Sequence, residues 1–281
     1  MVKVLRQLAI SIALLLTTVS KATDTSVEIY NNDELYVQEV QAALLPNVCN
    51  ALNLGDSSHI NYLDLAACDI YSQFNFKSYN ALDYDLFLMA YKGYLVMKSE
   101  GMISNNRYLT VMDCRLSANK RRLWVLDLEK HKIVIHELVS HGRNSGEEYA
   151  RSFSNRPESF QTSLGFYVTG MPYMGKNDYS LRLHGAEEGF NDNALERGIV
   201  MHGADYVSQT YIRHHKRLGR SQGCPAVAPK LSKWLINTIE GGSCLFIYYP
   251  DKKYLAKSEI LNAADPSKEL YQSKEYAVNL H

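Results

Sequence analysis

The residues between Met201 and Val227 could perform acyl transfer through a cysteine. Cys224 follows a serine, a glutamine and a glycine, and His202 stands before a glycine in the same stretch. A thiol attacks a carbonyl carbon as its thiolate, so its proton, with an ordinary pKa of about 8.5, must pass to a base such as histidine. Gly223 allows a sharp turn beside the sulfur that presents N–H groups to an oxyanion. We therefore predict that Cys224 is a nucleophile and His202 its base.

A purely structural role is the alternative for each residue taken alone. Cysteine is often a small buried apolar residue, and a histidine beside a glycine is common in turns. The combination favours catalysis, because Gly203 follows the histidine, Gly219 and Gly223 precede the cysteine, and Pro225 ends the segment after it.

The same stretch resembles the signature of the YkuD-type L,D-transpeptidases, in which HG is followed by S-x-G-C. Surrounding runs extend the resemblance to the murein L,D-transpeptidase catalytic domain family, from Thr110 to Asp251, about half of the chain. Gln222 differs from the second histidine that many members carry, at a position that is not the base. The resemblance implies a mainly β catalytic domain, a sandwich or barrel, and a cysteine enzyme that remodels bacterial peptidoglycan.

The resemblance also implies the reaction. Cys224 would attack the bond between diaminopimelate and D-alanine of a tetrapeptide stem, form a thioester and pass the acyl group to an amine. Ser221 is expected to hold the second ring nitrogen of His202, while the N–H groups of Cys224 and Gly223 stabilise the oxyanion. No cofactor is needed. Water as the acceptor would make an L,D-carboxypeptidase, and a peptidoglycan-binding module without catalysis is the alternative from another class.

Four further residues are expected to line the substrate cleft. Arg220 lies beside the S-Q-G-C tetrad, where its guanidinium could pair with a substrate carboxylate or with an internal one. Tyr206 ends the HGADY turn. Asn144 and Ser145 belong to a glycine loop, 141–146, that the resemblance places near the active site together with its histidine.

Other histidines offer weaker sites. His136 and His141 are five residues apart, which separates them by about 140° around a helix, whereas the HExxH zinc motif needs them on one face. His184 also precedes a glycine and is a rival base, although members of the family generally carry an acidic residue there. His214 and His215 lie in a basic run without evident further metal ligands.

The first residues are typical of an export signal. Lys3 and Arg6 precede a mostly apolar run, Leu8 to Val19, which is shorter than the about 20 residues that a membrane span needs. Removing a signal peptide at 1–22 leaves 27 basic and 30 acidic residues. We predict an exported protein, periplasmic or associated with the cell wall of a bacterium, monomeric and without stable membrane insertion. An uncleaved anchor is the alternative, and the balanced charge argues against nucleic acid as a partner.

The elements that position these residues change type along the chain. From Leu35 to about Gly101, apolar residues at helical spacing predict three or four helices. From Tyr108 onward, seven short runs rich in β-branched and aromatic residues predict strands. Helices are expected near Asn191–Arg197 and at Lys230–Glu240. The residues of the second of these helices that should face the core are Trp234, Leu235 and Ile239.

The predicted organisation is α+β, with a mainly β catalytic domain preceded by an α-helical region. Its parts are a signal peptide at 1–22, a helical N-terminal region at 23–104, the catalytic domain at 105–252 and a C-terminal tail at 253–281.

Five cysteines in an exported chain leave one unpaired thiol, which would be Cys224. Disulfides between Cys49 and Cys68 and between Cys114 and Cys244 would fit the remaining four. Because sequence does not establish connectivity, buried free thiols are the expectation for both pairs.

Overall fold

The computed structural model describes residues 62–76 and 81–267, which lie in one structural unit, Asp56–His281. The predicted signal peptide, Cys49 and most of the predicted N-terminal helical region lie outside the described residues. None of the helices in the described ranges is long and apolar enough to cross a membrane.

An eight-stranded mixed sheet forms the centre of this unit, with strand order β3-β2-β1-β8-β4-β5-β6-β7. The pairs β1–β8 and β6–β7 are parallel, and the other neighbours are antiparallel. The predicted mainly β domain is confirmed, and all seven predicted strands form; β7 was not predicted. The strands are β1 (Tyr108–Asp113), β2 (Leu123–Asp127), β3 (Lys132–Glu137), β4 (Gly165–Gly175), β5 (Asp178–Gly185), β6 (Val200–Gly203), β7 (Ala226–Val227) and β8 (Cys244–Tyr248).

The two edges of the sheet meet beyond β3 and β7. The N–H of Ser140, just past β3, donates to the carbonyl of Ala226 in β7 at 2.9 Å. Gly142 then forms a parallel bridge with Ser221. The chain leaving β3 therefore continues the sheet beside the segment that carries Cys224, and the sheet is nearly closed into a barrel.

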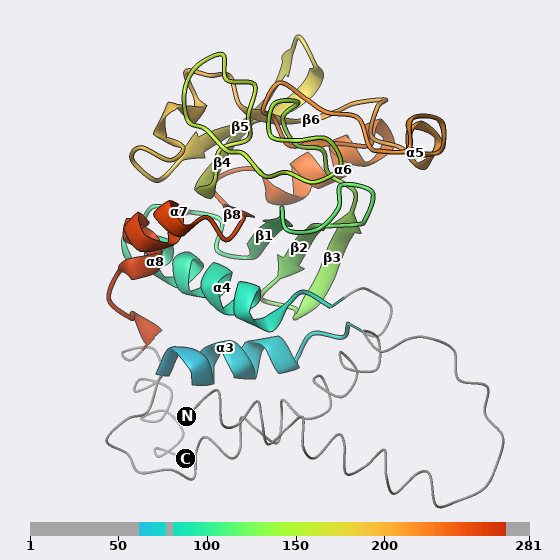
Figure 1. Cartoon of the computed structure of the whole chain (residues 1–281). Helices are drawn as coiled ribbons and strands as arrows, with labels where there is room; N and C mark the ends of the chain where they lie inside the picture. Colours follow the sequence, from blue (N-terminus) through green and yellow to red (C-terminus); the bar gives the residue numbers. More distant parts are fainter. Residues whose placement is uncertain (1–61, 77–80, 268–281) are drawn as a thin grey trace, which may run out of the picture. The chain divides into compact units, whose positions relative to one another are not determined.

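Helices cover both faces of the sheet, with α4 and α6 on opposite sides (Figure 1). α4 packs against β1 and β8, and α6 packs against β6, β5, β4 and β1. β8, between them, is buried along its whole length. The helices are α3 (Tyr62–Ser72), α4 (Tyr84–Ser99), α5 (Gln209–His215), α6 (Pro229–Ile239), α7 (Lys252–Lys257), α8 (Glu259–Asn262) and the 3₁₀ turn η2 (Asp192–Ala194).

The predicted helix at Lys230–Glu240 is α6, and the prediction for one of its side chains is wrong. Leu235 and Ile239 are fully buried as expected, but Trp234 is 54% exposed. Successive helical residues are about 100° apart, and the inward stripe of α6 is filled by Leu231, Leu235, Ile236 and Ile239. Trp234 therefore points to solvent.

The cysteines divide into one bonded residue and three free thiols among the described residues. Cys68 is disulfide-bonded, so the expectation of a free thiol there is wrong. Cys114 and Cys244 are free and fully buried, as expected. Burial raises the pKa of Cys114 to about 12 and also raises the pKa of Cys244. Neither of these two can serve as a nucleophile at neutral pH, because both lack access and thiolate character.

A buried carboxylate ties the C-terminal helices to the sheet. Glu187 is 4% exposed, and its Oε2 accepts from the N–H of Phe166 at 2.7 Å and from the hydroxyl of Tyr254 in α7 at 2.8 Å. Its Oε1 accepts from the hydroxyl of Ser258, the N-cap of α8. Residues of the predicted C-terminal tail therefore pack against the sheet.

The Glu187 carboxylate is expected to make stability depend on pH. Burial raises the pKa of Glu187 above its ordinary value. The unfolded chain therefore releases this proton at a lower pH than the folded protein does. The contribution of Glu187 to the free energy of unfolding is highest below the unfolded pKa, about 4.3. It falls as the pH rises through the folded pKa. Glu187→Gln keeps one carbonyl acceptor and can donate to Ser258. We expect the wild type to lose stability relative to Glu187→Gln as the pH rises above the unfolded pKa, measured by urea unfolding.

Glu187→Ala is the matched control for the hydrogen bonds. It removes all three acceptor contacts, so it should lower the free energy of unfolding by about 2–4 kcal/mol across the whole pH range. Parallel pH curves for the wild type and Glu187→Gln would contradict the assignment of a raised pKa.

Candidate active site

The Cys224 sulfur is held by the chain that leads into β6. Cys224 is 9% exposed, and its Sγ accepts from the N–H of Val200 at 3.5 Å and donates to the carbonyl of Gly198 at 3.7 Å. Burial raises the pKa of the Cys224 thiol, while the N–H of Val200, the charge of Arg197 and its own N–H act to lower it. The thiolate would thus have a backbone donor and a positive charge within reach.

His202 lies on β6 and has the tautomer that a base needs. Its Nδ1 lies 2.9 Å from the carbonyl of Gly203. Since a carbonyl only accepts, Nδ1 carries the proton and Nε2 the lone pair. Burial lowers the pKa of His202, which favours the neutral imidazole at neutral pH. This form can accept a proton.

The sheet places His202 next to the segment of the nucleophile. His202 is registered with Ala226 of β7, two residues after Cys224. Among the described residues, no hydrogen bond joins the imidazole to Sγ, which faces Gly198 and Val200 instead. The imidazole and the thiol are therefore not joined directly in this structure, and catalytic contacts commonly tighten only when substrate binds.

The turn before the nucleophile requires glycine. Gly223 has φ +123°, and a Cβ there would lie 2.9 Å from the carbonyl oxygen of Gln161. The N–H of Gly223 donates to Ser221 Oγ at 3.0 Å, and the Ser221 hydroxyl donates to the carbonyl of Cys224 at 2.6 Å. The serine thus joins both ends of the turn.

These contacts correct two expected roles. The carbonyl of Gly203, and not Ser221, holds the second nitrogen of His202, because the Ser221 hydroxyl is directed into its own turn. The N–H of Gly223 is likewise engaged inside the turn and is not directed at an oxyanion.

Arg220 is paired inside the protein. Its Nη1 donates to the carbonyls of Arg143 at 2.9 Å and Gly146 at 3.1 Å, and it pairs with Glu147 Oε1 at 2.7 Å. A substrate carboxylate and an internal carboxylate were the two partners expected for this arginine. The structure shows the internal one, Glu147. The guanidinium fastens the loop after β3 to the segment before Cys224.

Replacing Arg220 with methionine is expected to lower the free energy of unfolding by about 1–2 kcal/mol, because two loop carbonyls lose their donor. Glu147→Gln should change it by less than about 1 kcal/mol, since the Glu147 side chain is 71% exposed. Urea unfolding of both variants measures the difference. Equal effects would mean that the ion pair, and not the carbonyl contacts, is the stabilising interaction.

The other expected cleft residues differ in accessibility. Tyr206 is half-buried beside Gly219, and burial, followed by the charge of Cys224, raises its pKa to about 12. Asn144 is exposed and donates to the carbonyl of Ser159 at 2.9 Å. Ser145 is 1% exposed and accepts from the N–H of Thr162, so the structure contradicts its expected contact with substrate.

The remaining histidines lie in separate environments. His141 is fully buried, and its Nδ1 accepts from Arg122 Nη2 at 2.7 Å, so it does not line a cleft. His136 stacks on Trp124. His184 is exposed on β5 and registered with Val168, outside the part of β5 that pairs with β6. His214 and His215 are exposed. Within the described ranges, no three His, Cys, Asp or Glu residues could hold a metal ion together.

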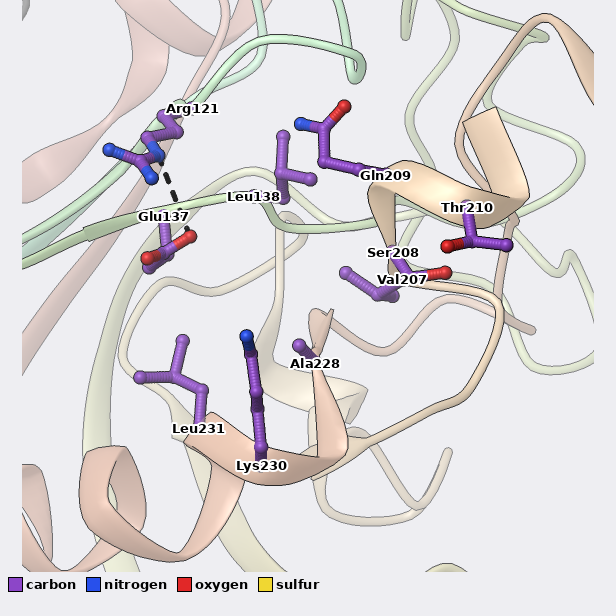
Figure 2. Close-up of a pocket in the computed structure, with 10 residues that line it drawn as sticks. All are labelled: Arg121, Glu137, Leu138, Val207, Ser208, Gln209, Thr210, Ala228, Lys230 and Leu231. Atoms are coloured by element: carbon purple, nitrogen blue, oxygen red, sulfur yellow. Dashed lines mark ion pairs between the residues drawn. The ribbon is translucent and has the colours of Figure 1, made fainter. Parts of the chain in front are cut away.

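A cavity of about 470 Å³ lies at the end of β3, between the starts of α5 and α6 (Figure 2). Arg121 and Glu137 form an ion pair at its wall, with 3.7 Å between Nε and Oε2. Neither Cys224 nor His202 lines it. The cavity is therefore distinct from the candidate nucleophile.

Sequence reasoning missed Arg197. This residue follows η2, five positions before His202, and is half-buried near Cys224. An arginine in a loop has no motif or periodicity that predicts such a place, because its neighbours there come from a distant segment, 154–163.

The fold and the candidate site are consistent with one class of protein. A nearly closed β-barrel that places a buried cysteine beside a neutral, carbonyl-anchored histidine has the groups that a cysteine acyltransferase uses. Residues 78–248 match the sequence model of the L,D-transpeptidase catalytic domain, and the chain belongs to this family. The match begins ahead of α4, so it extends further toward the N-terminus than the motifs indicated.

Solved structures similar to this chain include L,D-transpeptidases. One from Mycobacterium smegmatis is 13% identical over 51% of this chain and 59% of its own, with a TM-score of 0.32. L,D-transpeptidase 1 of Mycobacterium tuberculosis is 12% identical over 51% and 62%, with a TM-score of 0.30. One from Stackebrandtia nassauensis is 15% identical over 74% and 91%, with a TM-score of 0.31.

The chain covers less than two thirds of the first two of these structures. At such identities and TM-scores, the family assignment rests on the sequence match alone. No curated protein matches the chain.

Proposed function

We propose that the protein is a cysteine L,D-transpeptidase that acts on the stem peptides of peptidoglycan. The donor is a tetrapeptide stem, and the bond attacked joins diaminopimelate to the terminal D-alanine. The observation that supports this most strongly is the imidazole of His202, whose Nδ1 is fixed by the Gly203 carbonyl and whose Nε2 is left as the acceptor. Membership of the L,D-transpeptidase family supports the substrate class.

In the proposed mechanism, Nε2 of His202 takes the proton of the Cys224 thiol, and the thiolate attacks the carbonyl carbon. The tetrahedral intermediate collapses, the imidazolium gives its proton to the departing amine of D-alanine, and a thioester remains on Cys224. The N–H of Cys224 is the proposed oxyanion donor. An amine of a second stem then attacks the thioester and loses its proton to His202, the C–S bond breaks, and the Cys224 thiolate takes that proton back from the imidazolium.

The molecule that accepts the acyl group from Cys224 decides between two enzymatic activities. If water replaces the amine, the same two residues make an L,D-carboxypeptidase. A wall-binding module that retains the fold without turnover is the alternative outside enzyme chemistry. Tyr206 and Asn144 remain proposed contacts for the substrate, since Tyr206 lies within the electrostatic reach of Cys224 and Asn144 is exposed.

We further propose that residues 1–22 direct export, so that the enzyme works as a monomer in the periplasm or at the cell wall. The Cys68 disulfide supports an oxidising compartment. The proposed catalytic domain spans residues 105–252, preceded by the helical region at 23–104.

Intact-protein mass spectrometry of the full chain tests the proposal. Wild type and Cys224→Ala are mixed with tetrapeptide muropeptides and, separately, with a carbapenem. We expect an adduct of thioester mass on the wild type alone, with release of D-alanine. Peptide mapping should place the adduct on Cys224, since the other two free thiols of the described chain are fully buried.

The products separate the alternatives. Cross-linked dimers indicate an amine acceptor, and tripeptides without dimers indicate water. Binding of the muropeptides by a folded protein, with neither adduct nor turnover, would overturn the enzymatic assignment in favour of the binding module.

A further inference from the structure

Arg197 is surrounded by neutral acceptors. Its Nη1 donates to the carbonyl of Ser154 at 2.8 Å and to the hydroxyl of Ser163. Its Nη2 donates to the carbonyl of Gln161 at 2.7 Å and to the hydroxyl of Ser159 at 3.2 Å. None of the ion pairs among the described residues involves this guanidinium. Its positive charge is therefore not cancelled by a local carboxylate.

The guanidinium lies against the turn of the nucleophile. A Cβ on Gly223 would lie 3.3 Å from Nη2 of Arg197, and the Gln161 carbonyl that accepts from Nη2 would be its nearest contact at 2.9 Å. The next residue of the arginine's own chain, Gly198, supplies the carbonyl that accepts from Sγ of Cys224. Arg197 is therefore close to both segments that surround Cys224, the turn at Gly223 and the chain at Gly198.

We propose that Arg197 is a positioning residue for Cys224: its uncancelled charge stabilises the thiolate, and its hydrogen bonds hold segment 154–163 against the turn at Gly223. This inference rests on the proposed function of Cys224 as a nucleophile. The electrostatic coupling is mutual. Burial raises the pKa of Cys224 and the charge of Arg197 opposes this rise, while burial lowers the pKa of Arg197 and the charges of Tyr167 and Cys224 oppose that fall.

The geometry separates the two parts of this role. Four acceptors on one planar fork need a guanidinium, whereas stabilisation of a thiolate needs only a positive charge at that place. A lysine should therefore retain the charge and lose part of the fastening, while a methionine loses both. Arg156 is exposed and lies in the same loop. Its replacement by methionine removes one positive charge from a solvent-exposed position and is the matched control.

The test is the pH profile of alkylation of Cys224 by iodoacetamide in the full chain, followed by mass spectrometry of the Cys224 peptide. We expect Arg197→Met to move the midpoint of the profile upward by about one pH unit, so that alkylation well below the midpoint slows about tenfold. Arg197→Lys should have a midpoint close to the wild type but a lower Tm. Arg156→Met should match the wild type in both.

A midpoint that is unchanged in Arg197→Met would overturn the proposal, as would a shift of the same size in Arg197→Lys, which indicates a purely structural role. If Arg197→Met does not fold, the neutral Arg197→Gln takes its place and the same midpoint decides. Iodoacetamide needs no wall peptide, so this result stands apart from whether peptidoglycan is the substrate.

Discussion

Replacing His202 with glutamine is expected to slow acylation of Cys224 by about 10²- to 10⁴-fold, the usual contribution of a positioned general base. Glutamine can still donate to the carbonyl of Gly203, which holds Nδ1 in the wild type, but it cannot take a proton from the thiol. Single-turnover acylation by a carbapenem or a tetrapeptide stem, followed by intact mass, measures the rate.

The pH dependence gives a second check on the same residue. Because burial lowers the pKa of His202 below its ordinary value of about 6.5, the base stays neutral into mildly acidic solution. We expect the acylation rate of the wild type to fall only below that pH. His184→Gln, which removes the exposed histidine of the second His-Gly pair, is the control and should retain the full rate. Loss of acylation in His184→Gln would show that the wrong histidine had been taken as the base.

Gly223→Ala is expected to lower the acylation rate by about 10²-fold or more while the protein still folds. A side chain cannot easily adopt φ +123°, and its Cβ would press on the carbonyl of Gln161 at 2.9 Å. Relief of that contact must move the turn, and displacement of a reacting group by about 1 Å costs about 10²-fold. The same acylation assay, together with a thermal melt, measures the effect.

Gly101→Ala is the matched control for the backbone strain. Gly101 has φ +69°, in the left-handed region, with open space around a Cβ. The substitution should cost about 1 kcal/mol of stability and leave acylation unchanged. Wild-type acylation by Gly223→Ala would show that the turn tolerates a side chain.

The strands could be predicted because their local patterns are strong. The runs that form β1 to β6 and β8 are rich in β-branched and aromatic residues and bounded by turn residues. β7 has only two residues, Ala226 and Val227. It forms because it pairs with β6 and because the carbonyl of Ala226 accepts from the N–H of Ser140. No window of sequence contains that information.

The candidate site could be predicted where its residues are close in sequence and chemically distinctive, as with Cys224 and His202. The partner of His202 was not predictable, since it depends on the rotation of the ring toward the next carbonyl along the chain. Arg197 depends on a loop more than thirty residues earlier, brought close only by the fold. The internal pairing of Arg220 with Glu147 has the same origin.

The position of β8 in the sheet affects how the chain can fold. β8, almost the last of the described elements, lies between β1 and β4 and pairs with both. Until residues 244–248 are available, β1 and β4 each have an open edge, so the two halves of the sheet cannot pair through β8. Such long-range pairing gives a high contact order and slow folding. We expect a nascent chain that ends before Cys244 to expose these unpaired strand edges and to need protection from aggregation.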